Sequence, residues 1–433
     1  MRLRLRPPVV AAALLLLLAP PSLQASQGQE AVGAGGGLPP QPPSFSWETV
    51  PVFMHSGNSS GPLSNATAKF MSRFPIVTMA GFNGHWAGTN EAAVGPDAQL
   101  IKALNSSARV LHYQNALINF PQTELGKANS TLPEELLLHD KHGRLVYLGG
   151  CGSHHAAPNH TIYDHTQPAM RAAWVENIVK VVLSNHGMVD GVFCDRSGPI
   201  TAVLAKDLSC YEFEEGFAAE WDRGHWQAVA DTQTALNPLI QTAIVVGNHA
   251  SPQAAMHLKA PNLTWNAKMY EHFTPIKSAK MDYIPDGSQL RAFKKDGPLF
   301  IDEVHVDNCR VDMPEMAGDR VDTTTTMYRS SLAAFLIGAS EYSYYACTNG
   351  WGYADGWAHW SPDYDRPLGA PLGPAVATKT GWRRKFASGT EVWLATDDQA
   401  ALKWGSSCIR WADGHVTATG RLCHNGTVAN MEN

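Results

Sequence analysis

Two carboxylic acids, Asp195 and Glu271, each follow a short run of apolar residues that has the length and composition of a buried strand. A carboxylate at the end of such a strand is ill placed for packing. In a (β/α)8 barrel, that end of every strand lies on the catalytic face. Two carboxyl groups flanking one bond, a proton donor and a base or nucleophile, are what glycoside hydrolysis needs. We therefore interpret Asp195 as nucleophile or base and Glu271 as the proton donor.

A third catalytic candidate, Glu303, stands beside Asp302 in a later apolar run. Adjacent residues of a strand face opposite ways, so at most one of these two acids points into a barrel mouth. We expect a raised pKa for Glu271, from aromatic neighbours and from the charge on Asp195. The structural alternatives are a salt bridge from Asp195 to Arg196 and a solvated loop position for Glu271.

Amides, histidines and aromatic residues follow the same predicted strands or fill the loop after the last one. Indole faces stack on the C–H faces of sugar rings, and polar side chains bind sugar hydroxyls. The predicted substrate-binding residues are therefore Trp86, Asn248, His249, His272, Trp351, Tyr353 and Trp357. Packing of the aromatic loop residues in a core is the structural alternative.

We expect no cofactor and no catalytic metal. The sequence has no Walker or GxGxxG run, no HExxH and no EF-hand spacing, although His154 with His155, or His305 with Asp302 and Asp307, could hold an ion. The GNSSG match at 57–61 contains a glycosylation sequon and is followed by no clear helix, which argues against an esterase nucleophile.

Short apolar runs alternate with amphipathic stretches from residue 75 onward, which is typical of βαβ units. The predicted strands are 76–82, 109–114, a faint third near Ile162, 191–195, 243–248, 268–273, 299–304 and 342–346. The predicted helices are 97–104, 167–184, 213–237 and 323–337, and 51–55 is an additional strand before the barrel. The predicted fold is α/β, a (β/α)8 TIM barrel over 47–364, with a doubly wound open sheet as the alternative.

Alternation and turn signals without helical periodicity predict a small antiparallel β appendage over 365–433. Within it, Cys408 and Cys423 flank a predicted hairpin, and we expect them to form a disulfide. Cys194 is expected to be a buried free thiol, and the other four cysteines cannot be paired from sequence.

The first 25 residues have the charged and apolar regions of a secretory signal, and residues 26–46 form a predicted disordered linker. Removing the three arginines of the signal changes the formal charge from −6 to −9, which argues against nucleic acid or an anionic membrane as partner. Seven sequons predict N-linked glycans at Asn58, Asn65, Asn105, Asn129, Asn159, Asn262 and Asn425. We expect a secreted protein, or one in the lumen of the secretory or vacuolar system, with no membrane association after cleavage.

The order of several short motifs resembles a family of hypothetical glycosidases built on (β/α)8 barrels. The segments are QPAMRAAWVENIV, DGVFCD, AIVVGN, MYEHF, HWSPDYDRPLGAPLGPA and GWRRKFASGTEVWL, within residues 75–395. More distantly, the chain is similar to endo-α-polygalactosaminidase and α-amylase-clan barrels, in which an Asp ending strand four and a Glu ending a later strand are catalytic. The resemblance thus implies Asp195 and Glu271. One departure is Lys385, where the family has Glu.

Two functions are consistent with these residues. The first is a secreted glycoside hydrolase acting on an oligosaccharide or polysaccharide of an extracellular or cell-wall glycan. The alternative is a catalytically inactive barrel that binds glycans through the same pocket; a polysaccharide lyase or a metal-dependent deacetylase is a weaker third. Only the hydrolase requires two carboxyl groups about 5 to 10 Å apart.

Overall fold

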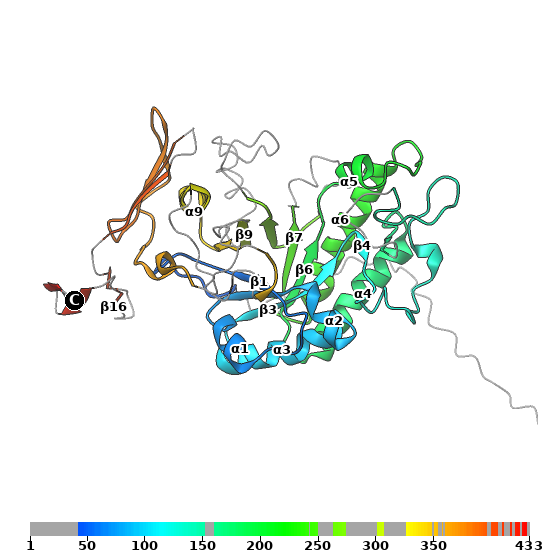
Figure 1. The fold of residues 1–433 in the computed structure, drawn as a ribbon, viewed down its shortest axis with the longest axis horizontal. Helices are drawn as coiled ribbons and strands as arrows, with labels where there is room; N and C mark the ends of the chain where they lie inside the picture. Colours follow the sequence, from blue (N-terminus) through cyan, green and yellow to red (C-terminus); the bar gives the residue numbers. More distant parts are fainter. Residues whose placement is uncertain are drawn as a thin grey trace, which may run out of the picture. The chain divides into compact units, whose positions relative to one another are not determined.

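The computed structural model describes residues 42–151, 160–241, 243–249, 263–273, 301–306, 326–348, 350–353, 357, 360–395, 400–405, 409–410, 416–417, 421–424 and 427–430. Its main feature is an eight-stranded sheet in which every paired neighbour is parallel (Figure 1). In sheet order, the strands are β1 (Met54–Ser56), β2 (Ile76–Met79), β3 (Arg109–Asn115), β6 (Gly191–Asp195), β7 (Ile244–Asn248), β8 (Ala267–Tyr270), β9 (Ile301–Val306) and β10 (Ser343–Cys347).

The two edges of this sheet meet just before β1. The Phe53 amide donates to the Tyr345 carbonyl at 3.3 Å, and the Tyr345 amide donates to the Pro51 carbonyl at 2.9 Å. These bonds join β10 to the chain that enters β1, so the sheet is nearly closed as a barrel. The predicted (β/α)8 fold is confirmed.

The strand count of the prediction is correct, but its membership is wrong at two places. The segment treated as additional, 51–55, contains β1 and is the first strand of the barrel. The faint third strand near Ile162 is β5 (Thr161–Ile162), which pairs antiparallel with β4 (Ile118–Asn119) outside the barrel. Two residues cannot span a barrel wall, and Ile162 packs with Ile118 of β4 in a separate small core instead.

The helices lie between the strands, and a side-chain hydrogen bond caps the start of two of them. They are α1 (Asn65–Met71), α2 (Gly84–Ala87), α3 (Asn90–Leu104), α4 (Pro168–Ser184), α5 (Thr201–Lys206), α6 (Phe217–Leu236) and α9 (Thr326–Gly338), with short 3-10 turns at Gly81–Asn83, Glu134–Leu136 and Pro362–Asp365. Thr89 accepts a hydrogen bond from the Ala92 amide, so α3 begins seven residues before the predicted start at Asp97. None of the helices in the described part of the chain is long and apolar enough to cross a membrane.

The described cysteines include both a disulfide and a free thiol. Cys151 and Cys210 form a disulfide that joins two loops around the β4–β5 insertion, a pairing that the sequence left open. Cys194 is a buried free thiol, as predicted. The predicted Cys408–Cys423 bridge involves Cys408, which lies outside the described residues.

An antiparallel sheet follows the barrel, as predicted, with the order β11 (Val376–Ala377), β12 (Gly381–Lys385), β13 (Glu391–Ala395) and β14 (Ala400–Lys403). Two small antiparallel pairs come after it, β15 (Ile409–Arg410) with β16 (Val416–Thr417) and β17 (Arg421–His424) with β18 (Thr427–Asn430). Lys385, the departure from the family pattern, forms an ion pair of 3.0 Å with Glu391 across two strands of this sheet.

Arg384 connects this sheet to the barrel. Its guanidinium is buried and donates to the carbonyls of Leu336, Ile337 and Ala339, at the C-terminal end of α9. A cation at that position also faces the negative end of the helix dipole.

We expect Arg384→Met to lower the free energy of unfolding by roughly 3 kcal/mol, since the buried carbonyls lose charged donors. Urea unfolding measures this loss, and an Arg383→Met control at the neighbouring, more exposed position should lose much less.

Candidate active site

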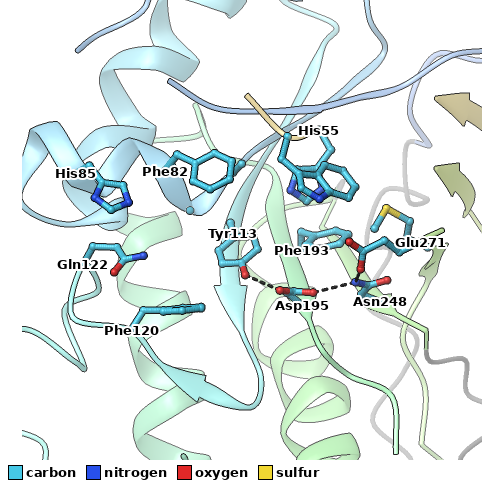
Figure 2. A pocket seen from close by; sticks show the side chains of 14 residues that line it. His55, Phe82, His85, Tyr113, Phe120, Gln122, Phe193, Asp195, Asn248 and Glu271 are labelled. Carbon is cyan, nitrogen blue, oxygen red and sulfur yellow. Dashed lines mark hydrogen bonds between the residues drawn. The ribbon is translucent and has the colours of Figure 1, made fainter. Parts of the chain in front are cut away.

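The centre of the barrel mouth is built by three neighbouring strands. Asp195 ends β6, Asn248 ends β7, and Glu271 directly follows β8. The Asn248 amide nitrogen donates to Asp195 Oδ1 at 2.8 Å and to Glu271 Oε2 at 2.7 Å (Figure 2). The two carboxylate oxygens can therefore be no further apart than the sum of these distances, about 5.5 Å. One amide holds both predicted carboxyl groups at one site.

Asp195 is surrounded by donors. Besides Asn248, the Tyr113 hydroxyl donates to it at 2.5 Å and the Asn115 amide at 2.9 Å, and the backbone N–H of Arg196 donates at 2.7 Å. Burial, followed by the charge on Asp195, raises the pKa of Tyr113 well above its usual value, so its hydroxyl stays a donor. An acceptor-only carboxylate satisfies all four donors, whereas the proton of a carboxylic acid would compete with them.

Glu271 is also held as an anion. Burial alone would raise the pKa of this carboxyl group, but the adjacent His249, the hydrogen bond from Asn248 and the charge on His272 outweigh burial and lower the pKa to about 2. The imidazoles of His249 and His272 lie 3.7 and 3.6 Å from its oxygens. The expectation of a raised pKa is therefore wrong for the free protein, because polar and cationic partners surround this group.

Each of the three strand ends is followed by a residue with a left-handed backbone. The φ angles are 53° at Arg196, 58° at His249 and 57° at His272. Non-glycine residues adopt this region at a cost of about 1–3 kcal/mol, and such positions concentrate at functional sites. The backbone therefore turns in the same way after three consecutive strands, directly behind each of the three residues of the site.

These groups open into a cavity of about 180 Å³. It is lined by His55, Ala80, Gly81, Phe82, His85, Tyr113, Phe120, Gln122, Phe193, Asp195, Asn248, Met269, Glu271 and Trp351. Trp351 is held between two imidazoles, with ring centres 4.4 Å from His55 and 3.8 Å from His305. Burial, and then the neighbouring His305, lower the pKa of His55 to about 3, so this ring is a neutral part of the wall.

Glu303 lies elsewhere. It is paired in register with Met269 and Tyr344, so its side chain shares their face and points into the barrel interior. It is 0% exposed and is absent from the lining of the cavity, and among the described residues neither carboxyl oxygen has a hydrogen-bond partner. Burial raises the pKa of Glu303 to about 8.

The predicted substrate-binding residues separate into two groups. Asn248 and Trp351 line the cavity, and His249 and His272 flank Glu271. Trp86, Tyr353 and Trp357 are not among the lining residues. Trp357 is 2% exposed, packs edge-on against Phe74 and donates to the His55 carbonyl, which anchors the loop to β1.

Several lining residues escaped the sequence reasoning. His55 is the middle residue of β1. The sequence does predict a strand at 51–55, but as an addition before the barrel, so His55 is not among the predicted site residues. Phe120 and Gln122 follow β4 in the insertion, and Phe82 precedes the predicted Trp86 by four residues. Asp164 and His165, which follow the faint third predicted strand near Ile162, are not among the lining residues; His165 is buried among Trp174, Trp221 and His225.

Metal ligands do not gather in the described part of the chain, where no three histidine, cysteine or acidic residues are arranged to hold an ion. Of the residues weighed for a metal in the sequence, His154, His155 and Asp307 fall outside the described residues.

A (β/α)8 barrel with a pocket at the carboxyl ends of its strands defines an enzyme of the TIM-barrel class. Residues 102–390 match the profile of Hypothetical glycosyl hydrolase family 15. The chain belongs to this family, which confirms the resemblance, and the class of enzyme is glycoside hydrolase. No curated protein matches the sequence.

Solved structures show distant likenesses. The glycoside hydrolase domain of PelA from Pseudomonas aeruginosa is 13% identical with a TM-score of 0.39, over 68% of this chain and 94% of that one. The noncanonic maltogenic α-amylase AmyB from Thermotoga neapolitana is 12% identical with a TM-score of 0.42, over 84% and 93%. Ega3 from Aspergillus fumigatus, solved in complex with galactosamine, is 10% identical with a TM-score of 0.34, over 63% and 86%. Likenesses this distant carry no argument about the substrate of this chain.

Proposed function

We propose that this protein is a retaining glycoside hydrolase, with Asp195 as nucleophile and Glu271 as acid and base. The supporting observation is the Asn248 amide, which bonds to both carboxylates and limits their nearest oxygens to about 5.5 Å. Retaining enzymes hold their two carboxyl groups about 5–5.5 Å apart, while inverting enzymes leave about 6.5–9.5 Å for a water. The separation also favours the hydrolase over the glycan-binding alternative, which needs no such pair.

The steps follow from the donors around each group. Asp195 attacks the anomeric carbon, Glu271 gives a proton to the departing oxygen, and a glycosyl ester forms on Asp195. Glu271 then takes a proton from a water that breaks this ester. Because Glu271 is ionised in the free protein, it takes up a proton when the sugar displaces water from the cavity, and the side chains of His249 and His272 beside it are placed to pass that proton to it.

The substrate class is an extracellular or cell-wall oligosaccharide or polysaccharide, met on the secretory route. Support comes from the signal-like N-terminal segment and from the Cys151–Cys210 disulfide, since such bonds persist in oxidising compartments. The sequon asparagines Asn65 and Asn129 are exposed, as attachment of a glycan requires. Trp351 in the wall of the cavity supplies an aromatic surface for a sugar ring.

An activity screen tests the proposal. The purified protein is incubated with a panel of nitrophenyl glycosides and with plant, fungal and algal polysaccharides, and the first product is followed by proton NMR. We expect hydrolysis with retention of anomeric configuration. An inverted first product would contradict the assigned roles, and saturable binding without any hydrolysis across the panel would favour the glycan-binding alternative.

Tyr113 gives a narrower prediction about orientation of the nucleophile. Its hydroxyl bonds to Asp195, and its ring is close to Gly81, where an added Cβ would meet ring carbons at 3.0 and 3.1 Å. We expect Tyr113→Phe to lower kcat about 10- to 100-fold with little change in KM, since one charged hydrogen bond is lost. Gly81→Ala should lower kcat in the same direction by pressing on the ring. Unchanged kcat in Tyr113→Phe would show that Asp195 is oriented without this bond.

A further inference from the structure

The cavity continues past Asp195 on the side away from Glu271. Figure 2 shows Asn248 and Glu271 on one side of Asp195, with Tyr113, Phe82 and Phe120 on the other and His85 and Gln122 at the far end. This arm of the cavity is built by the 3-10 turn after β2, by α2 and by the chain that leaves β4. Apart from Tyr113, which orients Asp195, none of its residues has a role in the chemistry derived above.

Two aromatic rings form the walls of this arm. Phe82 is 38% exposed, one of the few large apolar side chains that the described surface leaves open. Phe120 is held more rigidly: the Thr123 hydroxyl donates to its carbonyl at 2.8 Å, and its ring meets that of His160 edge-on at 4.9 Å. An aromatic face that is open to solvent inside a polar pocket is suited to the C–H face of a sugar ring rather than to packing.

The far end of the arm is polar, and no acidic side chain of the cavity lining lies there. Within the part of the chain that the structure describes, the Gln122 amide and the His85 imidazole have no hydrogen-bond partner. The carboxylates among the lining residues are Asp195 and Glu271, both at the reaction centre. An amide that both donates and accepts, next to an imidazole, matches a neutral polyhydroxylated ligand better than an ammonium or a phosphate.

We propose that Phe82, Phe120, His85 and Gln122 form the subsite for the glycone, the part of the substrate that becomes bonded to Asp195. The inference rests on the proposed function for its direction. Glu271 protonates the departing oxygen, so the leaving group lies on the side of Glu271 and the glycone extends the opposite way. That way leads between Phe82 and Phe120 toward His85 and Gln122 (Figure 2). These four residues then determine which sugar the protein accepts.

Kinetics with two matched substrates test this assignment. A nitrophenyl glycoside found by the activity screen and an oligosaccharide with the same non-reducing sugar share a glycone and differ in leaving group. We expect Phe82→Ala and Gln122→Ala each to lower kcat/KM by about tenfold or more, by the same factor for both substrates, because a stacking contact or hydrogen bond to the common glycone is lost. Leu239→Ala and Gln99→Ala, exposed positions outside the cavity, should leave kcat/KM unchanged.

The outcomes separate this inference from the proposed function. A loss confined to the oligosaccharide would place the four residues on the leaving-group side and overturn the inference, while the hydrolase itself would stand. Unchanged kcat/KM in both variants would also overturn it. If the wild-type protein hydrolyses nothing, binding to an array of neutral oligosaccharides replaces the rate. Binding that falls in Phe82→Ala and Gln122→Ala but not in Leu239→Ala supports the subsite, and binding that persists in all variants contradicts it.

Discussion

Asp195→Asn should lower kcat/KM by a factor on the order of 10⁴ or more while the protein still folds, because the substitution keeps the shape of the side chain and removes the nucleophile. Glu271→Gln should lose as much on substrates with poor leaving groups. The losses are measured with the glycosides found by the activity screen, and near-ultraviolet circular dichroism checks that the variants are folded. Some loss of stability is expected in Asp195→Asn, since Tyr113, Asn115 and Asn248 all donate to this position.

The leaving group distinguishes the two roles. A nitrophenolate departs without a proton, so Glu271→Gln should recover much of its kcat/KM on nitrophenyl glycosides, and Asp195→Asn should not. The kcat of Glu271→Gln should stay low, because Glu271 is also the base for the water that breaks the ester. The reverse pattern would exchange nucleophile and acid. Glu303→Gln serves as the comparison, because Glu303 is buried outside the cavity lining. Loss of activity in Glu303→Gln with normal rates in the other two variants would move the reaction centre to β9.

The fold could be predicted from the sequence because most barrel strands are continuous apolar runs with helices between them. The predicted run 191–195 has the bounds of β6, where a left-handed glycine, Gly191, begins the strand and Asp195 ends it. β1 was misjudged because it has three residues and no preceding helix marks it as a repeat unit. The run at Ile162 has the composition of a strand, but it pairs with β4 and not with a barrel strand. This pairing depends on the tertiary structure and cannot be inferred from the local sequence.

The site could be predicted only as far as strand ends determine it. Asp195, Asn248 and Glu271 follow apolar runs on adjacent strands, so barrel closure brings them together. Phe120 and Gln122 reach the cavity from an insertion, and His55 depends on β1 belonging to the barrel. The charge state of Glu271 could not be predicted from the sequence either. It depends on the imidazoles of His249 and His272, two residues with a left-handed backbone, lying next to the carboxylate.

Glu303 combines burial with the lack of a hydrogen-bond partner among the described residues, and this combination has a consequence for stability. Its pKa is about 8 in the folded protein against 4.5 when the chain is unfolded. Below pH 4.5 the group is neutral in both states, so its titration does not change the stability. Between pH 4.5 and pH 8 the unfolded chain releases the proton while the folded protein keeps it, so the folded state loses stability as the pH rises. The loss approaches about 5 kcal/mol at pH 8 and then stops growing.

Glu303→Gln removes this titration and keeps the volume of the side chain. We expect the variant and the wild type to unfold at similar urea concentrations at pH 4.5, and the variant to be more stable by up to about 5 kcal/mol at pH 8. Glu391→Gln is the matched control. Hydrogen bonds from Lys385 and then Arg383 outweigh the burial of Glu391 and lower its pKa, so this substitution should give no gain at pH 8. If wild type and Glu303→Gln lose stability in parallel from pH 4.5 to 8, Glu303 is ionised in the folded protein, and a cation or donor must reach it in the barrel interior.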